Sequence, residues 1–293
     1  MNMQLVAGAT RETWQGLACT RLALACGDSL RVSDFGAQVL SWQSGGQERL
    51  FLSPRSVLDG SFPIRGGIPI CFPQFNRRGT LPKHGIARRS AWQFVQAKAG
   101  SQADQQLHAQ WRWQHSADTQ AMWPQHIAAN VHVSLQPGQM QVVLEVENQG
   151  DAPWPFTAAL HSYLRTERTD ACQLLGLEGS AYWDTTNNAM RPAVQQGAVA
   201  FGAEVDRVYP GSSQPLTLQG GMPSTLRIAQ DAAWGETVVW NPGEALCAQL
   251  EDMAPDSWQH MLCVEAAHIN QPVALLPGTS WRAGQALSVS VPA

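Results

Sequence analysis

Hydrophobic and polar positions alternate along this chain over short stretches. Residues 131–148, VHVSLQPGQMQVVLEVEN, show two such runs on either side of a Gln-Pro-Gly-Gln sequence. A period of two places the apolar side chains on one face of a β-strand, and a Pro-Gly pair between two such runs is typical of a turn. The segment therefore predicts a β-hairpin.

Other stretches have the same character. Residues 30–43, LRVSDFGAQVLSWQ, form a β-like run that is interrupted by Gly36, and STLRIAQD, ETVVWNPG and MLCVEAAHI are short apolar runs that end at turn residues. No window carries a sustained helical stripe, and the 25 Gly and 18 Pro are scattered rather than gathered into a linker. The pattern predicts an all-β chain in which residues 1–293 form a single large β-sandwich domain.

Composition narrows the class of protein. The 293 residues are 44% hydrophobic, which is enough for a large core, and a net charge of −4 with 14% charged residues argues against nucleic-acid binding and against disorder. The six cysteines form no CxxC pair, and the sequence contains neither a secretion signal nor an apolar run long enough for a membrane helix. We expect a protein of the reducing cytoplasm that binds neither nucleic acid nor membrane.

One basic stretch stands apart from this composition. Residues 64–92, IRGGIPICFPQFNRRGTLPKHGIARRSAW, hold six of the 19 Lys and Arg residues and are called the cation loop below, and no acidic residue lies between Asp59 and Asp104. Its cations are Arg65, Arg77, Arg78, Lys83, Arg88 and Arg89. Arginines on a segment stiffened by Gly and Pro suit a small dianion such as a phosphate monoester, because guanidinium groups match phosphate oxygens at two points. The alternative is a surface loop whose arginines pair with acids elsewhere in the chain.

A histidine is predicted on the polar face of one strand. In FTAALHSYLRT (156–166), strand alternation places His161 on the same face as Thr157, Ala159 and Tyr163. Small and polar neighbours suit a cavity wall. The segment alone nevertheless favours a hydrogen-bonded structural histidine over a catalytic one.

Two carboxylates are further candidates. Glu265 ends an apolar run, and burial would raise its pKa towards the range of a general base, although a glutamate at a strand end can also simply reach solvent. Asp206 in GAEVDRVYPG (202–211) fits a weak ion pair within a loop when it is taken alone. His260 and His268 flank Glu265 without the spacing of metal ligands, so no metal site is predicted.

Six segments, in this order, carry a family resemblance: RGGIPICFPQF, LPKHGIARRSAW, ALHSYLRT, EVDRVYPG, VVWNPG and MLCVEAAHI. They resemble the hexose-6-phosphate mutarotases, also called glucose-6-phosphate 1-epimerases, of the aldose 1-epimerase superfamily. The resemblance covers nearly the whole chain. It implies a single-domain galactose-mutarotase-like β-sandwich (supersandwich) and a cytoplasmic, monomeric isomerase of carbohydrate metabolism that binds a sugar phosphate and needs neither cofactor nor metal.

The resemblance also implies roles for individual residues. It makes His161 the general acid and Glu265 the general base. It assigns substrate binding to Arg65, Lys83, His84, Arg88 and Asp206. The implied reaction is the interconversion of the α and β anomers of an aldose 6-phosphate, with glucose 6-phosphate first among the candidates.

Three positions depart from the family pattern. Position 83 is commonly Gln and is Lys83 here, the family often has Glu-Pro-Gly where this chain has Glu265-Ala266-Ala267, and Gly243 replaces a Trp. These changes would reshape the cleft, so the preferred sugar stays open. A mutarotase for unphosphorylated aldoses and a non-catalytic sugar-phosphate-binding protein are the alternatives, although a binding protein has no use for a matched acid and base.

Overall fold

The computed structural model describes residues 5–100, 105–186, 191–212 and 214–290. This part of the chain folds into three antiparallel β-sheets, and its helical segments are short. They are η1 (Ala87–Arg89), α1 (Ala117–Met122), η2 (Thr169–Ala171), α2 (Gly243–Cys247) and η4 (Ser257–Gln259). Within the described ranges, no helix is both long and apolar enough to span a membrane.

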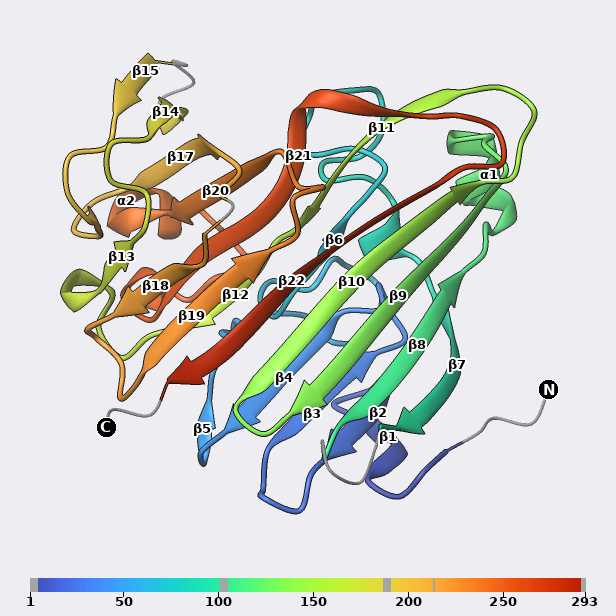
Figure 1. Cartoon of the computed structure of the whole chain (residues 1–293), viewed down its shortest axis with the longest axis horizontal. Helices are drawn as coiled ribbons and strands as arrows, with labels where there is room; N and C mark the ends of the chain where they lie inside the picture. Colours follow the sequence, from blue (N-terminus) through green and yellow to red (C-terminus); the bar gives the residue numbers. More distant parts are fainter. Residues whose placement is uncertain (1–4, 101–104, 187–190, 213, 291–293) are drawn as a thin grey trace.

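The largest sheet has nine strands, and its long central strands run side by side in Figure 1. In order of pairing they are β16 (Val199–Ala200), β13 (Gln173–Leu175), β18 (Leu216–Gln219), β19 (Thr225–Gln230), β22 (Ser280–Ser290), β10 (Gln139–Asn148), β9 (Ile127–Gln136), β8 (Leu107–Trp113) and β7 (Trp92–Ala99). The predicted hairpin of residues 131–148 is confirmed as β9 and β10, which turn at Pro137 and Gly138. Gly138 has a positive φ of 71°, which glycine adopts without strain.

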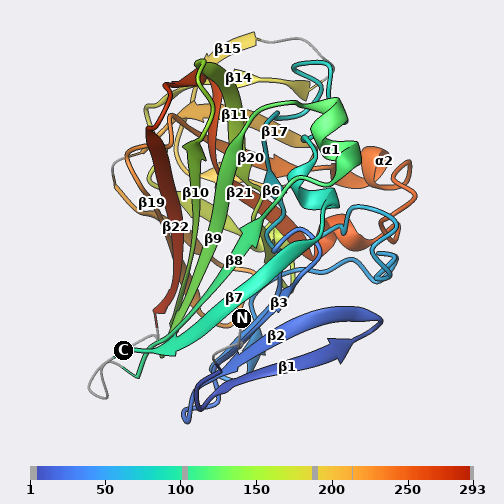
Figure 2. The same ribbon diagram turned by 90° about the vertical axis from the view of Figure 1, so that its right-hand side faces the viewer.

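A five-stranded sheet is built from the N-terminal residues. It consists of β1 (Ala9–Trp14), β2 (Leu17–Ala23), β3 (Ser29–Ser33), β4 (Val39–Ser44) and β5 (Gln47–Glu48). The predicted interruption at Gly36 separates β3 from β4. The Gly36 N–H donates to the carbonyl of Ser90 over 2.8 Å, and a Cβ at Gly36 would lie 3.0 Å from the carbonyl oxygen of Arg88. Figure 2 shows β1 and β2 beside the edge of the nine-stranded sheet.

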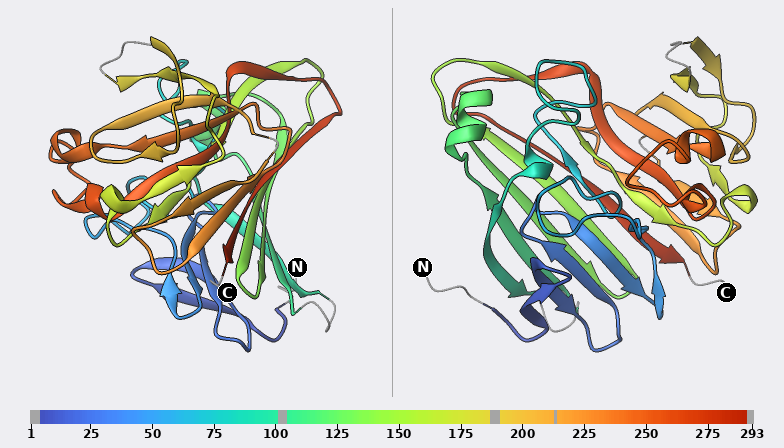
Figure 3. Two further views of the ribbon diagram at one scale, coloured as in Figure 1. Left: turned by 60° about the vertical axis from the view of Figure 1, so that its left-hand side comes forward. Right: turned by 180° about the vertical axis from the view of Figure 1, so that it is seen from behind.

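Most of the candidate site residues lie in or next to the strands of the eight-stranded sheet. Its strands are β15 (Arg191–Val194), β14 (Ala181–Asp184), β17 (Val205–Pro210), β20 (Glu236–Asn241), β21 (Met261–Leu275), β11 (Trp154–Leu160) and β6 (Ile70–Cys71), with β12 (Tyr163–Arg165) paired to β21 beyond the end of β11. Figure 3 shows its yellow and orange strands as a layer distinct from the green strands of the nine-stranded sheet.

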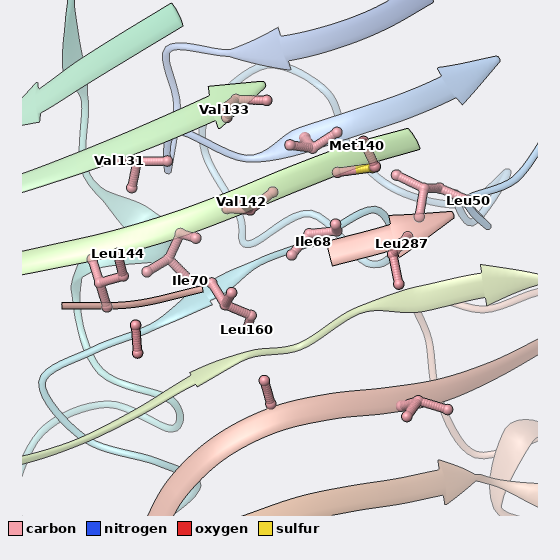
Figure 4. Close-up of a cluster of buried hydrophobic side chains, with 14 of the residues drawn as sticks. Leu50, Ile68, Ile70, Val131, Val133, Met140, Val142, Leu144, Leu160 and Leu287 are labelled. Atoms are coloured by element: carbon pink, nitrogen blue, oxygen red, sulfur yellow. The ribbon is translucent and has the colours of Figure 1, made fainter. Parts of the chain in front are cut away.

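One hydrophobic core joins the three sheets. Figure 4 shows Val131, Val142 and Leu144 of the nine-stranded sheet near Ile70 and Leu160 of the eight-stranded sheet. Burying apolar side chains of this size stabilises the fold by roughly 1.5–3 kcal/mol each. The prediction of an all-β sandwich is therefore confirmed.

Alternation along β21 decides which side chains leave this core. Leu262, Val264 and Ala266 belong to the core, whereas Ala267 belongs to a separate cluster of buried residues. Glu265 alternates with the core residues, so its side chain lies on the opposite face of the sheet.

Candidate active site

The cation loop packs against the edge of the eight-stranded sheet. Its β6 pairs with β11, the His161 N–H donates to the Pro69 carbonyl over 3.0 Å, and the Thr157 N–H donates to the Pro73 carbonyl over 3.0 Å. Glycines allow this close packing, because a Cβ at Gly67 would lie 2.0 Å from the Val39 carbonyl oxygen and both Gly67 and Gly85 have positive φ angles, of 60° and 75°. Larger residues at the glycine positions of RGG and HG would therefore clash with the neighbouring backbone.

His161 and Glu265 face each other at the centre of this region. Nε2 of His161 lies 3.4 Å from Oε1 of Glu265, and the two side chains are 9% and 2% exposed. His161 follows the last residue of β11, and Glu265 lies within β21, so two non-consecutive segments bring the pair together. The sequence predicted both residues, and the fold places them in contact range.

Burial perturbs both members of the pair. Burial raises the pKa of Glu265 well above its ordinary value, and the nearby Asp206 carboxylate raises it further. Burial also lowers the pKa of His161, and the positive charges of Arg65 and Arg88 lower it further. These shifts favour a pair without net charge that holds one proton.

Arg65 differs from the other predicted cations because it has an acidic partner. Its Nε and Nη2 donate to the two carboxylate oxygens of Asp252, each over 3.0 Å, and its Nη1 donates to the hydroxyl of Tyr163 over 3.1 Å. For this residue the alternative of an acid elsewhere in the chain is correct. Asp252 carried no signal in the sequence, because it lies 187 residues away from Arg65.

Lys83 and Arg88 have no such partner. Among the described residues, no carboxylate lies within salt-bridge distance of either side chain. Arg88 donates from Nη2 to the Lys83 carbonyl over 2.9 Å, while its buried Nε has no hydrogen-bond partner. The Lys83 side chain is exposed, and partial loss of hydration together with the charges of Arg65 and Arg88 lowers its pKa. Uncompensated positive charge of this kind favours an anion.

His84 belongs to the cation loop and lies beside the pair. Its imidazole ring is buried 5.4 Å from that of His161, and its Nδ1 is 3.3 Å from both the Asn76 N–H and the Cys71 thiol. The Asn76 N–H donates to Nδ1, so the ring carries its proton on Nε2. Burial, together with the neighbouring His161 and Arg88, lowers the pKa of His84. A neutral His84 can donate a hydrogen bond from Nε2.

Asp206 lies in a row of side chains that crosses the sheet. It is directly opposite Trp240 in the β17–β20 pairing, Trp240 is opposite Cys263, and Cys263 is opposite Tyr163. Residues opposite each other in antiparallel strands share a face, so the row lies on the same face as Glu265. Burial raises the pKa of Asp206 above its ordinary value. The lone-segment interpretation of Asp206 as part of a loop ion pair is therefore wrong.

A cavity of about 480 Å³ includes residues of the cation loop in its lining, but neither His161 nor Glu265 lines it. Arg65, Arg88 and Tyr163 line it, and the exposed side chains of Val57 and Phe62 contribute to its apolar part. This volume is in the range of small-molecule sites. Val57 and Phe62 could not be predicted as lining residues from the sequence, because single exposed apolar residues are common on any protein surface.

Arg78, His260 and His268 make contacts away from the pair. Arg78 donates to the carbonyl of Ile269 over 2.9 Å, Nδ1 of His260 lies 3.1 Å from the Glu167 carbonyl oxygen, and Nδ1 of His268 lies 3.2 Å from the Ala233 carbonyl oxygen. These contacts are structural.

Three possible metal ligands meet at the pair. One ligand atom each of His161, Cys263 and Glu265 lies within 4.8 Å of the others. The spacing of His260 and His268 could not reveal this group, because it forms across strands. The positive charges of Arg65, Lys83 and Arg88 oppose a cation at this position.

Two of the departures from the family pattern have structural consequences. Gly243 has a positive φ of 61°, and a Cβ there would lie 2.7 Å from the backbone nitrogen of Glu204, so a tryptophan would require the backbone to move. Ala266 belongs to the core, whereas Ala267 lies in the cluster on the other face of the sheet with Cys71 and Val208.

The chain is similar to known proteins. Residues 21–288 match the family model described as Aldose 1-epimerase. Two relatives, both named "Putative glucose-6-phosphate 1-epimerase", come from Cenchrus ciliaris (30% identical over 260 residues, 87% of this chain and 79% of the relative) and Salmonella typhimurium (29% over 251 residues, 81% and 79%).

Solved structures share the fold. A crystal structure of a "putative mutarotase (YeaD)" from Salmonella typhimurium has a TM-score of 0.88 at 24% identity and covers 99% of this chain and 96% of its own. A "galactose mutarotase-like protein" from Clostridium acetobutylicum has a TM-score of 0.78 at 14% identity, with coverages of 97% and 98%. At these identities the likeness concerns the fold, and it confirms the predicted galactose-mutarotase-like sandwich.

Proposed function

The chain belongs to the aldose 1-epimerase family of isomerases, and from this premise we propose that it interconverts the α and β anomers of an aldose 6-phosphate, with glucose 6-phosphate as the preferred sugar. The observation that carries the choice of a phosphorylated sugar is the position of Lys83 and Arg88. Both lack an acidic partner in the described part of the chain, and both lie near a buried pair of one imidazole and one carboxyl group. The names of the two relatives support the same substrate.

The proposed chemistry uses the pair for two proton transfers. Glu265 takes the proton of the anomeric hydroxyl, the bond between C1 and the ring oxygen breaks, and His161 gives a proton to that oxygen. The open aldehyde rotates about the C1–C2 bond, and the reverse transfers close the ring on the other face. Each transfer typically contributes about 10²- to 10⁴-fold to the rate.

The substrate's phosphate supports the protonation that this chemistry needs. A phosphate monoester carries close to two negative charges at neutral pH. Bound near Arg65, Lys83 and Arg88, it offsets the positive charges that lower the pKa of His161. The proton of the pair then shifts towards His161 and leaves Glu265 ionised. In this proposal the phosphate prepares the acid and base as well as orienting the sugar.

The other predicted residues take binding roles. His84, with a free Nε2–H, donates to a sugar oxygen, and Asp206 accepts a hydrogen bond from a sugar hydroxyl. Arg65 keeps N–H groups that neither Asp252 nor Tyr163 uses, and these face the phosphate. The phosphate stays bound while the ring is open, which keeps the aldehyde in the cleft.

Anomer exchange on matched sugars tests the proposal. Saturation-transfer NMR measures exchange between the α and β anomers of a panel of aldose 6-phosphates and of the corresponding free aldoses. We expect glucose 6-phosphate to have the highest kcat/KM and free glucose to be slower by at least about 10-fold, because each hydrogen bond to a charged group contributes on the order of 1.5–3 kcal/mol.

The panel also distinguishes the alternatives. Equal kcat/KM for glucose and glucose 6-phosphate would identify a mutarotase for unphosphorylated aldoses. Tight binding of glucose 6-phosphate without exchange above the spontaneous rate would identify a binding protein. Either result would overturn the proposed function.

A further inference from the structure

The orientation of His161 has an unusual basis. A functional histidine is commonly fixed by a hydrogen bond from its second ring nitrogen to a carbonyl or a carboxylate. Here Nδ1 of His161 is buried and has no hydrogen-bond partner. Apart from the 3.4 Å contact of Nε2 with Glu265, the ring is held by packing rather than by a hydrogen bond at Nδ1.

Tyr163 supplies that packing. Its ring stacks on the imidazole of His161 with the ring centroids 4.7 Å apart and the planes 9° from parallel. Trp240 meets both rings edge-on, at 6.1 Å from His161 and 6.2 Å from Tyr163. Since Tyr163 is only 2% exposed and is paired in β12 with Cys263 of β21, its ring is a rigid surface rather than a mobile one.

The hydroxyl of the same tyrosine contacts the cation loop. It accepts a hydrogen bond from Nη1 of Arg65 over 3.1 Å, and Asp252 holds the other side of that guanidinium through two bonds. Tyr163 also lines the cavity of about 480 Å³ that Arg65 and Arg88 line. A single side chain thus touches both the histidine and the arginine that the proposed function assigns to acid catalysis and to phosphate binding.

We propose that Tyr163 is a positioning residue that holds the imidazole plane of His161 through its ring and joins it to the phosphate-binding Arg65 through its hydroxyl. This inference rests on the proposed function. The ring and the hydroxyl have separate consequences, because stacking on His161 affects the chemical step for every sugar, whereas the bond to Arg65 concerns only a phosphorylated sugar.

Three variants separate these consequences. Tyr163→Phe keeps the ring and removes the hydroxyl, Tyr163→Leu removes the ring and the hydroxyl, and Tyr163→Met does the same with a flexible side chain that fills the space better. The kcat and KM of each variant are measured for glucose 6-phosphate and for free glucose by anomer exchange. Thermal unfolding shows which variants are folded at the assay temperature.

The expected pattern is a split between kcat and KM. Tyr163→Leu and Tyr163→Met lower kcat on both sugars by roughly 10- to 100-fold, because small displacements of a catalytic group are costly. Tyr163→Phe restores kcat to within about 3-fold of the wild type and raises KM for glucose 6-phosphate alone by roughly 3- to 10-fold.

Tyr209 provides a matched control. It is fully buried in β17 and donates its hydroxyl to Oε1 of Gln195 over 2.7 Å, within the core rather than at the site. Tyr209→Phe therefore removes a buried tyrosine hydroxyl without touching His161 or Arg65. We expect its kcat and KM to match the wild type on both sugars.

Two outcomes would overturn the inference. One is an unchanged kcat in folded Tyr163→Leu and Tyr163→Met, and the other is a Tyr163→Phe variant that loses as much kcat as Tyr163→Leu. A wrong choice of substrate in the proposed function would give a different result. The wild type would then not prefer glucose 6-phosphate, while the effect of the ring on kcat would still be measurable with free glucose.

Discussion

The β9–β10 hairpin and the β11–β12–β21 segment are both buried and antiparallel, but they differ in regularity. The pairing of β9 with β10 runs without a break from Gln139 opposite Gln136 to Asn148 opposite Ile127. The pairing of β11 with β21 shifts register between Phe156 and Ala158. The first region has a ladder of matched hydrogen bonds and alternating burial. The second shifts register at Thr157 and returns to regular pairing at Ala158–Leu160, just before His161.

Unsatisfied polar atoms follow the same division. The β11–β12–β21 segment has buried side-chain atoms without a hydrogen-bond partner at Nε1 of Trp154, Nδ1 of His161 and Oε2 of Glu265. The β9–β10 hairpin has none, although other such atoms occur elsewhere in the described part of the chain, for example at Nε1 of Trp113 in β8. Such atoms cost stability, of the order of 1–3 kcal/mol each. The comparison teaches that the regular hairpin contributes stability without such a cost, whereas the segment that carries the proposed acid/base pair loses part of its stability to unsatisfied polar atoms.

The largest expected effect is a loss of anomer exchange when the proposed base is removed from the irregular segment. Glu265→Gln keeps the shape of the side chain and removes the base, so we expect anomer exchange of glucose 6-phosphate to fall by about 10²- to 10⁴-fold. Binding of the sugar phosphate, measured by calorimetry, should be largely retained. Exchange at a rate near that of the wild type would exclude Glu265 from the mechanism.

A matching change in the regular region should have the opposite result. Leu144 in β10 is fully buried in the core, and Leu144→Ala should lower the free energy of unfolding by about 2–5 kcal/mol. The kcat of the folded variant should stay within about 2-fold of the wild type, since the substitution is outside the site. Urea denaturation and anomer exchange on the same sample check both statements. A large loss of kcat at a temperature where the variant is folded would show that the two regions are not separable.

A smaller effect distinguishes the cations within the cation loop. Arg88→Ala should lower kcat/KM for glucose 6-phosphate by roughly 10- to 100-fold and leave the exchange of free glucose almost unchanged. Arg78→Ala is the matched control, because Arg78 lies on the same loop and contacts the Ile269 carbonyl instead. Inorganic phosphate should compete with the substrate in the wild type and less in Arg88→Ala. Equal losses on both sugars would make Arg88 a structural residue.

The smallest effect concerns stability as a function of pH. The folded protein raises the pKa of Glu265 above its ordinary value of 4.5, so this group contributes stability below pH 4.5 that is lost as the pH rises towards the raised value. Glutamine does not titrate. The stability of Glu265→Gln relative to the wild type should therefore grow by up to about 1.4 kcal/mol per pH unit above 4.5 and then level off.

Urea denaturation at several pH values measures that difference. Leu144→Ala serves as the reference, since its effect involves no titrating group and should not depend on pH. A pH-independent difference between Glu265→Gln and the wild type would mean that the carboxyl group is not perturbed by burial.

The two regions also differed in how well the sequence predicted them. The alternation in residues 131–148 and the Pro-Gly turn identified the β9–β10 hairpin, because a regular ladder repeats its pattern with every second residue. The same alternation in residues 156–166 placed His161 and Tyr163 on one face, and their stacked rings confirm this. It did not reveal the register shift after Phe156, which depends on the partner strand.

Contacts between side chains that are far apart along the chain could not be predicted from the sequence. The resemblance to the family named His161 and Glu265, but nothing in the chain indicated that Asp252 pairs with Arg65 or that Nδ1 of His161 has no partner. Tyr163 lies in the segment ALHSYLRT, but no role was predicted for it. Each of these facts depends on side chains that meet only when β11, β12 and β21 are assembled.

A double-variant cycle on His161 and Glu265 tests the central claim most directly. Anomer exchange of glucose 6-phosphate is measured for the wild type, His161→Gln, Glu265→Gln and the double variant. If the two residues act as one acid/base unit, each single substitution costs at least about 10²-fold and the double variant is at most about 10-fold slower than the slower single variant. Losses that multiply across the cycle would show that the two side chains act independently, and the account of a coupled pair in the irregular region would be wrong.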